Sequence, residues 1–196
     1  MLSFTDRLVY TIPSKLPDDL ISSMIKYVEE MEYEDASIGG IMPMPSNNEP
    51  YRSSKVAWIN WDEWIAGIIH NIMISANKEY FKYDLTHFQT HIQATIYNGS
   101  NKDFYTWHVD SGAGAMKRED GVVTERKLSC SLILSDPEEY TGGELQFHYY
   151  KNFFISTKPK KGDALIFPAW MPHRVRPVKS GKRISLVAWM NGPCFK

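Results

Sequence analysis

The sequence contains little that would indicate a disulfide-stabilised or membrane-spanning protein. It has only two cysteines in 196 residues, Cys130 and Cys194, and no CxxC spacing, which is too few for a disulfide framework. No apolar run approaches the roughly 18 residues that span a bilayer, and the N-terminus lacks the basic and apolar segments of a secretory signal. We therefore expect a cytoplasmic protein that associates with no membrane.

The sequence also lacks an excess of charge of either sign. It has 22 lysines and arginines against 23 aspartates and glutamates, a net charge of −1, so we expect no nucleic-acid partner. What it does have is 43% hydrophobic and 13% aromatic residues, which is enough to bury a sizeable core. We predict a single domain over residues 1–196, with helices and a loop in 1–82 and a β core in 86–192.

Two amphipathic helices are expected in the first part of the chain. LPDDLISSMIKYVEEM, in which Pro17 precedes two acidic residues, has apolar residues at helical spacing. A second helix should follow Asn60, where Glu63 resembles the end of a capping box. Gly39 to Lys55 lies between them and is rich in proline, glycine and asparagine, so it predicts a long loop that borders a site.

From His87 onward the hydrophobic pattern changes to period two. Six to eight short segments rich in β-branched and aromatic residues follow, and turn residues such as SDPEEYTGG and KPKKG separate them. Because no helical segment interrupts the series, the pattern favours a sandwich, barrel or jelly roll over an α/β sheet.

The stretch YTWHVDS places His108 and Asp110 two residues apart. Side chains two apart on a strand point the same way, so the imidazole and the carboxylate can reach one ion, which His173 can join. Two histidines and one carboxylate leave three positions open on a metal, as in non-haem Fe(II) oxygenases. An HxD pair alone is explained equally well by a surface ion pair.

A second signal lies ten residues after His173, in RISLVAW. If this is a strand, Arg183 and Ser185 share one face. An arginine inside a small barrel needs a partner, and its planar fork suits a carboxylate, to which a serine hydroxyl can add another hydrogen bond. We expect Arg183 to anchor an anionic co-substrate whose other end lies near the ion.

In combination these motifs resemble the 2-oxoglutarate- and Fe(II)-dependent dioxygenases. The resemblance covers roughly residues 51–192 and includes the segments RSSKVAWI, IYNGS, LSCSLILSDPEEYTGGELQF and KGDALIFPAWMPHRVRPVKSGKRISLVAW. It is strongest to the prolyl 4-hydroxylase-type branch, in particular to bacterial hydroxylases associated with iron uptake. The family implies a mainly β fold with flanking N-terminal helices, the double-stranded β-helix or jelly roll.

The resemblance also implies roles for individual residues. His108, Asp110 and His173 would ligate Fe(II), Arg183 would bind the distal carboxylate of 2-oxoglutarate, and all four would be required for catalysis. Tyr97 falls where relatives often place a tyrosine that hydrogen-bonds the co-substrate.

One departure concerns the partners of that arginine. Ser185 matches an Arg-x-Ser variant of the co-substrate site. The strand after WHVD, which offers a second tyrosine in some relatives, has only Ser129, Ser131 and aliphatic residues here. The residue that assists Arg183 is therefore left open.

The implied reaction uses O2 to couple decarboxylation of 2-oxoglutarate to hydroxylation of an unactivated C–H bond, with release of succinate and CO2. The substrate would be a peptidyl residue such as proline, or a free amino acid; relatives commonly use ascorbate to keep the iron reduced. One alternative is a catalytically silent module that binds metal and 2-oxoglutarate. Another is a cupin-type metalloprotein, but that pattern needs HxH followed by a glutamate, which HVDSGAGAM lacks.

Other residues are expected to play smaller parts. We interpret His70, His87, His91 and His148 as packed or surface histidines. Trp107, Trp170 and Trp189 either line the substrate pocket or pack, with Trp170 the best candidate for a substrate contact. Gly112 to Arg126 is predicted to form a flap that selects the substrate together with the proline-rich loop.

Overall fold

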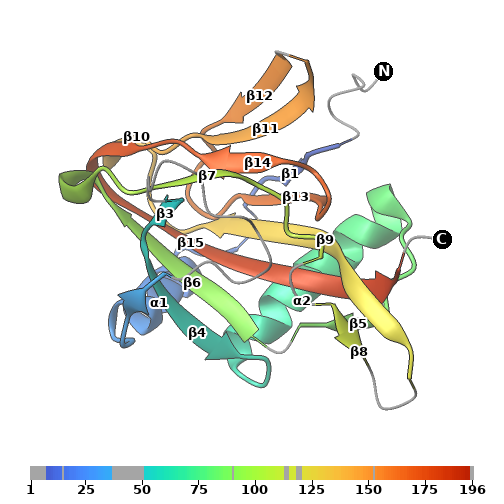
Figure 1. Cartoon of the computed structure of the whole chain (residues 1–196). Helices are drawn as coiled ribbons and strands as arrows, with labels where there is room; N and C mark the ends of the chain where they lie inside the picture. Colours follow the sequence, from blue (N-terminus) through green and yellow to red (C-terminus); the bar gives the residue numbers. More distant parts are fainter. Residues whose placement is uncertain are drawn as a thin grey trace.

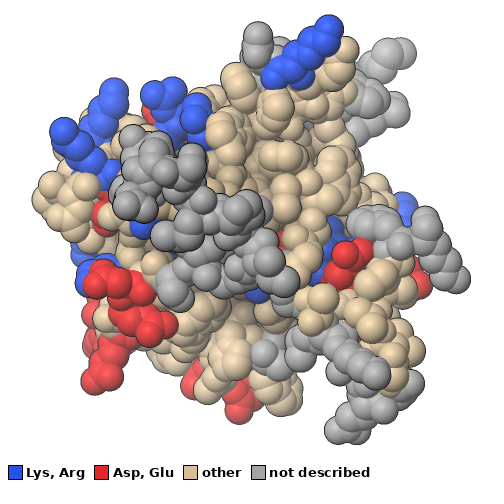
Figure 2. Space-filling view, viewed as in Figure 1, with Lys and Arg blue, Asp and Glu red and all other residues tan. Residues whose placement is uncertain are grey.

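The computed structural model describes residues 8–14, 16–36, 51–89, 91–112, 115–117, 121–151 and 153–194. Two antiparallel β-sheets face each other, and two helices cover the outer face of the larger sheet (Figure 1). This arrangement confirms the predicted mainly β jelly roll with N-terminal helices. Both charge signs are spread over the face shown in Figure 2, with basic side chains gathered at its upper left and acidic ones at its lower left.

The larger sheet has ten strands. Its main path runs in the order β1 (Tyr10–Ile12), β13 (Ala164–Pro168), β9 (Val123–Ile133), β15 (Val178–Pro193), β6 (His91–Asn98), β4 (Lys55–Asn60) and β2 (Glu34–Asp35). Two further strands, β5 (His87–Phe88) and β10 (Tyr140–Gly142), pair with β15, and β8 (Met116–Lys117) pairs with β9.

The smaller sheet has five strands. It runs in the order β12 (Phe153–Thr157), β11 (Leu145–Tyr150), β14 (His173–Val175), β7 (Phe104–His108) and β3 (Arg52–Ser53). Four strands that precede residue 61 thus belong to the two sheets, because β1, β2 and β4 join the larger one and β3 the smaller.

Both expected helices are present as α1 (Asp18–Glu29) and α2 (Trp64–Ala76). Helix α2 continues into the π-helical turn η2 (Asn77–Phe81), and the 3-10 turn η3 (Gly99–Asn101) follows β6.

The prediction of a capping box at Asn60 is wrong. Glu63 is itself the N-cap residue, its side chain makes no cap hydrogen bond, and its carbonyl accepts the Ala66 N–H at 2.9 Å. The N–H of Glu63 instead bonds the Asn60 carbonyl in a turn, which delays the helix by three residues.

The two faces of β15 separate the hydrophobic core from the space between the sheets. Ile184, Leu186 and Ala188 pack into the cluster that contains the helix residues, and burial of a side chain as large as isoleucine or leucine contributes roughly 1.5–3 kcal/mol. The alternate residues Arg183 and Ser185 point to the other face, toward the smaller sheet, and are also buried. The alternation predicted for RISLVAW is therefore present.

No helix in the described part of the chain is long and apolar enough to cross a membrane.

Candidate active site

The structure brings His108, Asp110 and His173 together between the two sheets. One ligand atom from each lies within 4.8 Å of the other two, and all three residues are buried. His108 ends β7 and His173 begins β14, and the two residues pair directly in the smaller sheet. The Nε2 atoms of His108 and His173 lie 3.8 Å and 3.6 Å from the Asp110 carboxylate oxygens. Side chains that lie up to 65 positions apart in the sequence therefore converge on one point.

Backbone carbonyls fix both imidazoles in the tautomer that a metal requires. His108 Nδ1 donates to the Thr106 carbonyl at 2.8 Å, and His173 Nδ1 donates to the Met171 carbonyl at 2.9 Å. Since a carbonyl only accepts, Nδ1 carries a proton in both rings, and Nε2 is the nitrogen that faces Asp110. This is the arrangement that orients histidines in metal sites.

Two hydrogen bonds hold Asp110 in place, one to a strand of the larger sheet and one to the turn that follows β13. Its Oδ2 accepts the Ser129 hydroxyl of β9 at 2.6 Å, and its backbone N–H donates to the Ala169 carbonyl, after β13, at 2.8 Å. Sequence analysis had considered Ser129 only as a replacement for a tyrosine. The structure shows instead that it orients the carboxylate.

Burial and neighbouring charges set the protonation of His108 and Asp110. Burial, together with neighbouring His173, lowers the pKa of His108 to about 3, against the opposing charge of Asp110. Burial acts to raise the pKa of Asp110, but the two histidines, Arg126 and Ser129 outweigh it and lower that pKa. A neutral imidazole beside an ionised carboxylate is the form that binds a metal cation near neutral pH.

Arg183 is 1% exposed and lies on the face of β15 that looks toward the smaller sheet. Its Nη1 donates to the Ser185 hydroxyl at 3.0 Å, and its Cζ lies 5.5 Å from the centre of the Tyr97 ring. Within the described ranges no carboxylate pairs with this guanidinium. A buried cation without an anionic partner is costly, so the surroundings of Arg183 fit an anionic ligand.

Strand β6 supplies the neighbouring wall. Tyr97 pairs with Arg183 and Thr95 with Ser185, so the face predicted to carry Tyr97, Thr95 and Gln93 does lie beside the arginine. All three residues are buried, and Gln93 Nε2 donates to Thr95 Oγ1 at 2.7 Å. The sequence-predicted site residues thus occupy adjacent strands of one surface between the sheets.

Two further arginines, which the sequence reasoning missed, border the triad. Arg126 Cζ lies 3.8 Å from the centre of the Trp189 ring, and its Nε donates to Gln89 Oε1 at 2.7 Å. Regular alternation would place Arg126 on the core face with Leu128, but β9 carries one extra residue opposite Met190 and Asn191. A bulge of this kind re-aims a side chain and has no signature in the sequence.

Arg52 approaches from β3. Its Cζ lies 4.6 Å from the centre of the Tyr105 ring, which in turn stacks on the His108 imidazole at 3.6 Å. Its Nε donates to the Ser54 hydroxyl at 2.8 Å, whereas its Nη2 is buried without a hydrogen-bond partner. The segment RSSKVAWI contributes to the family resemblance, but nothing in its spacing indicates that Arg52 faces the triad.

The three tryptophans separate into different environments. Trp107 lies on the outer face of the smaller sheet, stacked on Phe154 at 5.3 Å and covered by Arg174 at 4.5 Å, so it faces away from the triad. Trp189 faces the site and carries Arg126. Trp170 is 42% exposed in the turn after β13, and its contact with substrate stays a prediction.

The two predicted specificity loops are only partly described. Gly39 to Pro50 lies outside the described residues, whereas Arg52–Ser53 and Lys55, at the end of the predicted loop, belong to strands. The end of the predicted flap, from Val123 to Arg126, is the start of β9. The β-branched pair Val122-Val123 favours that extension of the strand.

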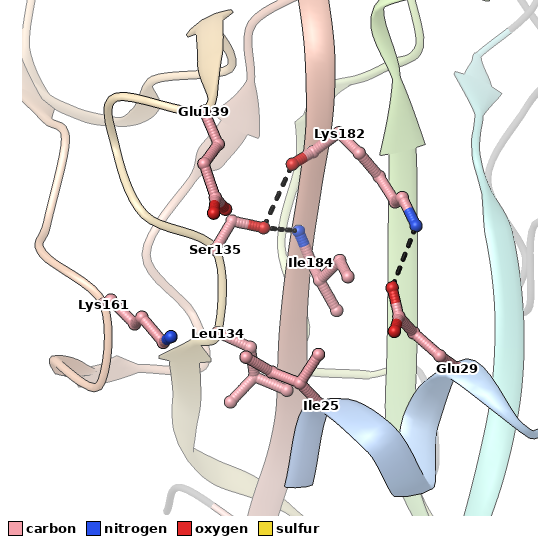
Figure 3. Close-up of a pocket in the computed structure, with 8 residues that line it drawn as sticks. All are labelled: Ile25, Glu29, Leu134, Ser135, Glu139, Lys161, Lys182 and Ile184. Atoms are coloured by element: carbon pink, nitrogen blue, oxygen red, sulfur yellow. Dashed lines mark hydrogen bonds and ion pairs between the residues drawn. The ribbon is translucent and has the colours of Figure 1, made fainter. Parts of the chain in front are cut away.

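A surface hollow of about 310 Å³ lies on the opposite side of β15 (Figure 3). Lys182 and Ile184 line it from β15, and a Lys182–Glu29 ion pair of 3.1 Å joins the strand to α1 at its edge. Because Arg183 points to the other face of the same strand, this hollow is separate from the surface that carries the triad.

Comparison with known proteins agrees with this geometry. Residues 92–191, about half of the chain, match the family model described as the 2OG-Fe(II) oxygenase superfamily, where 2OG denotes 2-oxoglutarate. The chain therefore belongs to this superfamily, as the motifs predicted. The matched segment contains His108, Asp110, His173 and Arg183.

Among individual relatives, a PKHD-type hydroxylase of Janthinobacterium sp. (strain Marseille) is 37% identical over 89 residues, which cover 45% of this chain and 38% of that protein. The match thus spans well under half of that relative's length. The PKHD-type hydroxylase YbiX of Escherichia coli O81 (strain ED1a) is 23% identical over 93% of this chain and 78% of that protein.

The fold also matches solved structures. A Pseudomonas putida prolyl-4-hydroxylase superposes with a TM-score of 0.67 over 97% of this chain and 95% of that one, at 20% identity. The resemblance to PKHD-type and prolyl 4-hydroxylase-like proteins is thereby supported, whereas the branch associated with iron uptake stays a prediction.

Proposed function

We propose that this protein is a 2-oxoglutarate- and Fe(II)-dependent dioxygenase that hydroxylates an unactivated C–H bond. The observation that carries the proposal is the buried set of two histidines and one carboxylate beside a buried arginine without a carboxylate partner among the described residues. A surface ion pair, the plain alternative for the HxD motif, does not fit three buried side chains. Membership of the oxygenase superfamily supports the same reading.

The residues present fit both groups. His108, Asp110 and His173 would hold Fe(II), because they offer two imidazole nitrogen atoms and one carboxylate oxygen and leave the remaining positions of a metal open. Arg183 and Ser185 would hold the distal carboxylate of 2-oxoglutarate, with Tyr97 beside them. Bound together, iron and 2-oxoglutarate supply the activation of O2, with release of succinate and CO2.

The chain's own contribution is orientation and exclusion of water. The carbonyls of Thr106 and Met171 fix the two imidazoles, and the Ser129 hydroxyl fixes Asp110, so the ligand atoms converge before any metal arrives. The surrounding aromatic residues keep the site dry, which strengthens each electrostatic contact.

On the substrate side we propose that Arg52 and Arg126 contact polar groups of the bound molecule. Each guanidinium is oriented by an aromatic ring and by one hydrogen bond through Nε, and each lies beside the triad. Arg126→Gln should reduce substrate-stimulated succinate formation about tenfold and leave the Kd for 2-oxoglutarate unchanged. An equal loss in both measurements would place Arg126 in the co-substrate site instead.

The substrate we propose is a peptidyl residue such as proline, or a free amino acid. The support is the similarity to proteins named PKHD-type hydroxylase and prolyl-4-hydroxylase. Ascorbate as reductant, a relation to iron uptake, a cytoplasmic location and a single functional domain belong to the same proposal. The two partly described loops are the segments we propose to select the substrate.

The test is a mass-spectrometric screen of proline-containing peptides and free amino acids for a gain of one oxygen, with His108→Ala as control. We expect one substrate class to gain oxygen in step with succinate formation. If the purified protein binds iron and 2-oxoglutarate but forms no succinate with any candidate, the silent binding module is the better description. If it binds neither, the proposal is wrong.

A further inference from the structure

Resting on the proposed function, we propose that Tyr140 is the residue that assists Arg183: its hydroxyl donates a hydrogen bond to the distal carboxylate of 2-oxoglutarate. Neither the motifs nor the family resemblance pointed to this tyrosine. It lies in SDPEEYTGG, a segment that the sequence predicted only as a turn.

Tyr140 is placed beside Arg183 by strand pairing. It begins β10, which pairs with β15, and Tyr140 lies opposite Gly181, two residues before the arginine. Its side chain is 2% exposed and packs between the sheets with Tyr97 and Ile133. All of these residues border the same buried end of the site.

Gly143 demonstrates how closely the two side chains approach. A Cβ atom at this position would lie 3.1 Å from Arg183 Cδ and 3.2 Å from Tyr140 Cε2, so the glycine backbone touches both. With φ at +68°, Gly143 has a conformation that favours glycine. Because glycine has no side chain, the side chains of Arg183 and Tyr140 can both pack against its backbone.

The Tyr140 hydroxyl lacks an acceptor. Its oxygen can accept a hydrogen bond from the Arg183 guanidinium, but the hydroxyl proton has no acceptor within the described part of the chain. Arg183 has only donors, and the Lys158 ammonium that lies 4.6 Å from the ring centre is bonded to the carbonyls of Pro137 and Tyr140. Leaving a buried hydroxyl unpaired costs about 1–3 kcal/mol. The Arg183 guanidinium and the Tyr140 hydroxyl thus both offer hydrogen-bond donors at this place, and a carboxylate can accept from both and neutralise the charge.

The hydroxyl is available as a donor at neutral pH. Burial raises the pKa of Tyr140, and the nearby Arg183 charge only partly opposes the shift. The neighbouring strand offers no competitor, because the β9 residue that pairs with Ser185 is the aliphatic Ile133. Tyr140 from β10 therefore occupies the place for which β9 has no tyrosine.

The experiment compares two 2-oxo acids with the Fe(II)-loaded protein in the absence of oxygen. 2-Oxoglutarate has the distal carboxylate, whereas 2-oxobutyrate lacks it, and calorimetric titration gives the Kd for each. Tyr140→Phe removes only the hydroxyl. We expect it to weaken 2-oxoglutarate binding about tenfold or more and to change 2-oxobutyrate binding less than about twofold.

Tyr33→Phe is the matched control, because Tyr33 donates to the Val28 carbonyl on the helix side of the larger sheet. It should leave both Kd values unchanged. Thermal unfolding supplies a readout that a merely structural tyrosine would not give. Without ligand, Tyr140→Phe should change the Tm little or raise it, since the buried hydroxyl that it removes has no acceptor for its proton, yet the Tm increase on adding 2-oxoglutarate should shrink.

Two results would overturn the inference alone: an unchanged Kd for 2-oxoglutarate in Tyr140→Phe, or an equal weakening of both 2-oxo acids. A ligand-free Tm that falls, together with equal weakening, would assign Tyr140 to packing. If the unaltered protein binds 2-oxobutyrate and 2-oxoglutarate equally or not at all, the co-substrate site itself is wrong, and the proposed function fails with it.

Discussion

The metal end and the co-substrate end of the proposed active site differ in how far the protein itself supplies hydrogen-bond partners for their polar side chains. At the metal end, each of the three ligating side chains has a hydrogen bond that fixes its orientation, to Thr106, Met171 or Ser129. At the co-substrate end, Arg183 donates to Ser185, and the proton of the Tyr140 hydroxyl has no acceptor among the described residues. The fold alone therefore orients the side chains of the metal end, whereas we propose that an anion completes the hydrogen bonding of the co-substrate end.

The difference follows from what each end must bind. A cation site needs lone pairs, and the protein can hold these in place with its own donors and carbonyls. An anion site needs donors, and any protein acceptor placed there would compete with the ligand. We therefore expect changes at the metal end to affect metal binding first, and changes at the other end to affect 2-oxoglutarate binding while iron remains.

The largest effect is expected from removing a metal ligand. Asp110→Ala should lower iron affinity by more than about a hundredfold, because it deletes the only anionic ligand of the triad. Metal analysis after dialysis and succinate formation measure the loss. Asp163→Ala, an aspartate outside the site, is the control. Normal iron content in Asp110→Ala would refute the assignment of the triad.

Arg183 comes next. Arg183→Met should weaken 2-oxoglutarate binding by about a hundredfold, roughly 3 kcal/mol, because truncating one partner of a buried charge pair costs 2–5 kcal/mol. Arg183→Lys keeps the charge but loses the planar fork, so about a tenfold loss is expected. Both variants should retain iron. Calorimetry and metal analysis check this, and loss of iron in parallel with 2-oxoglutarate would remove the distinction between the two ends.

Ser129→Ala tests the support of the metal end. The Asp110 carboxylate would lose its 2.6 Å hydrogen bond, and outer contacts of this kind are worth about tenfold in metal affinity. We expect iron to bind about tenfold more weakly. Ser131→Ala, two residues further along β9, should have a smaller effect. Equal effects of both variants would mean that the hydroxyl of Ser129 does not orient the aspartate.

The smallest effect concerns the metal-free protein. The pKa of His108 is lowered from 6.5 to about 3 in the fold, so the unfolded chain binds the extra proton as the pH falls below about 6.5. The contribution of His108 to the free energy of unfolding is therefore complete above pH 6.5 and is lost as the pH falls from about 6.5 toward 3. Between pH 7.5 and 5.5 the free energy of unfolding should fall by about 1.4 kcal/mol.

Urea unfolding of the metal-free protein at both pH values measures this change. In His108→Gln the difference between the two pH values should shrink by the same amount. A difference that stays the same in the variant would mean that His108 is not desolvated in the folded protein.

The sequence was sufficient to predict the parts of the molecule that local patterns encode. Period-two alternation predicted the strands and placed Arg183 and Ser185 on one face, and the HxD spacing placed His108 and Asp110 together. The roles of these residues in binding iron and 2-oxoglutarate are implied by the family resemblance. The geometry adds that His173 pairs with His108 across two strands.

Other features depend on long-range geometry, which a local pattern does not contain. Arg126 reaches the site because β9 has an extra residue opposite β15, and Tyr140 reaches it because a turn segment pairs with β15. The late start of α2 at Trp64 likewise follows from a turn at Asn60 that competes with a cap. In each case strand pairing or a local turn overrides the pattern.

The most direct test of the account is an anaerobic titration of the purified protein with Fe(II) and then 2-oxoglutarate. We predict one iron per chain, and one 2-oxoglutarate that binds tightly only after iron and is lost in Arg183→Met while iron remains. Binding of 2-oxoglutarate that is indifferent to both iron and Arg183 would contradict the claim that these side chains form one site.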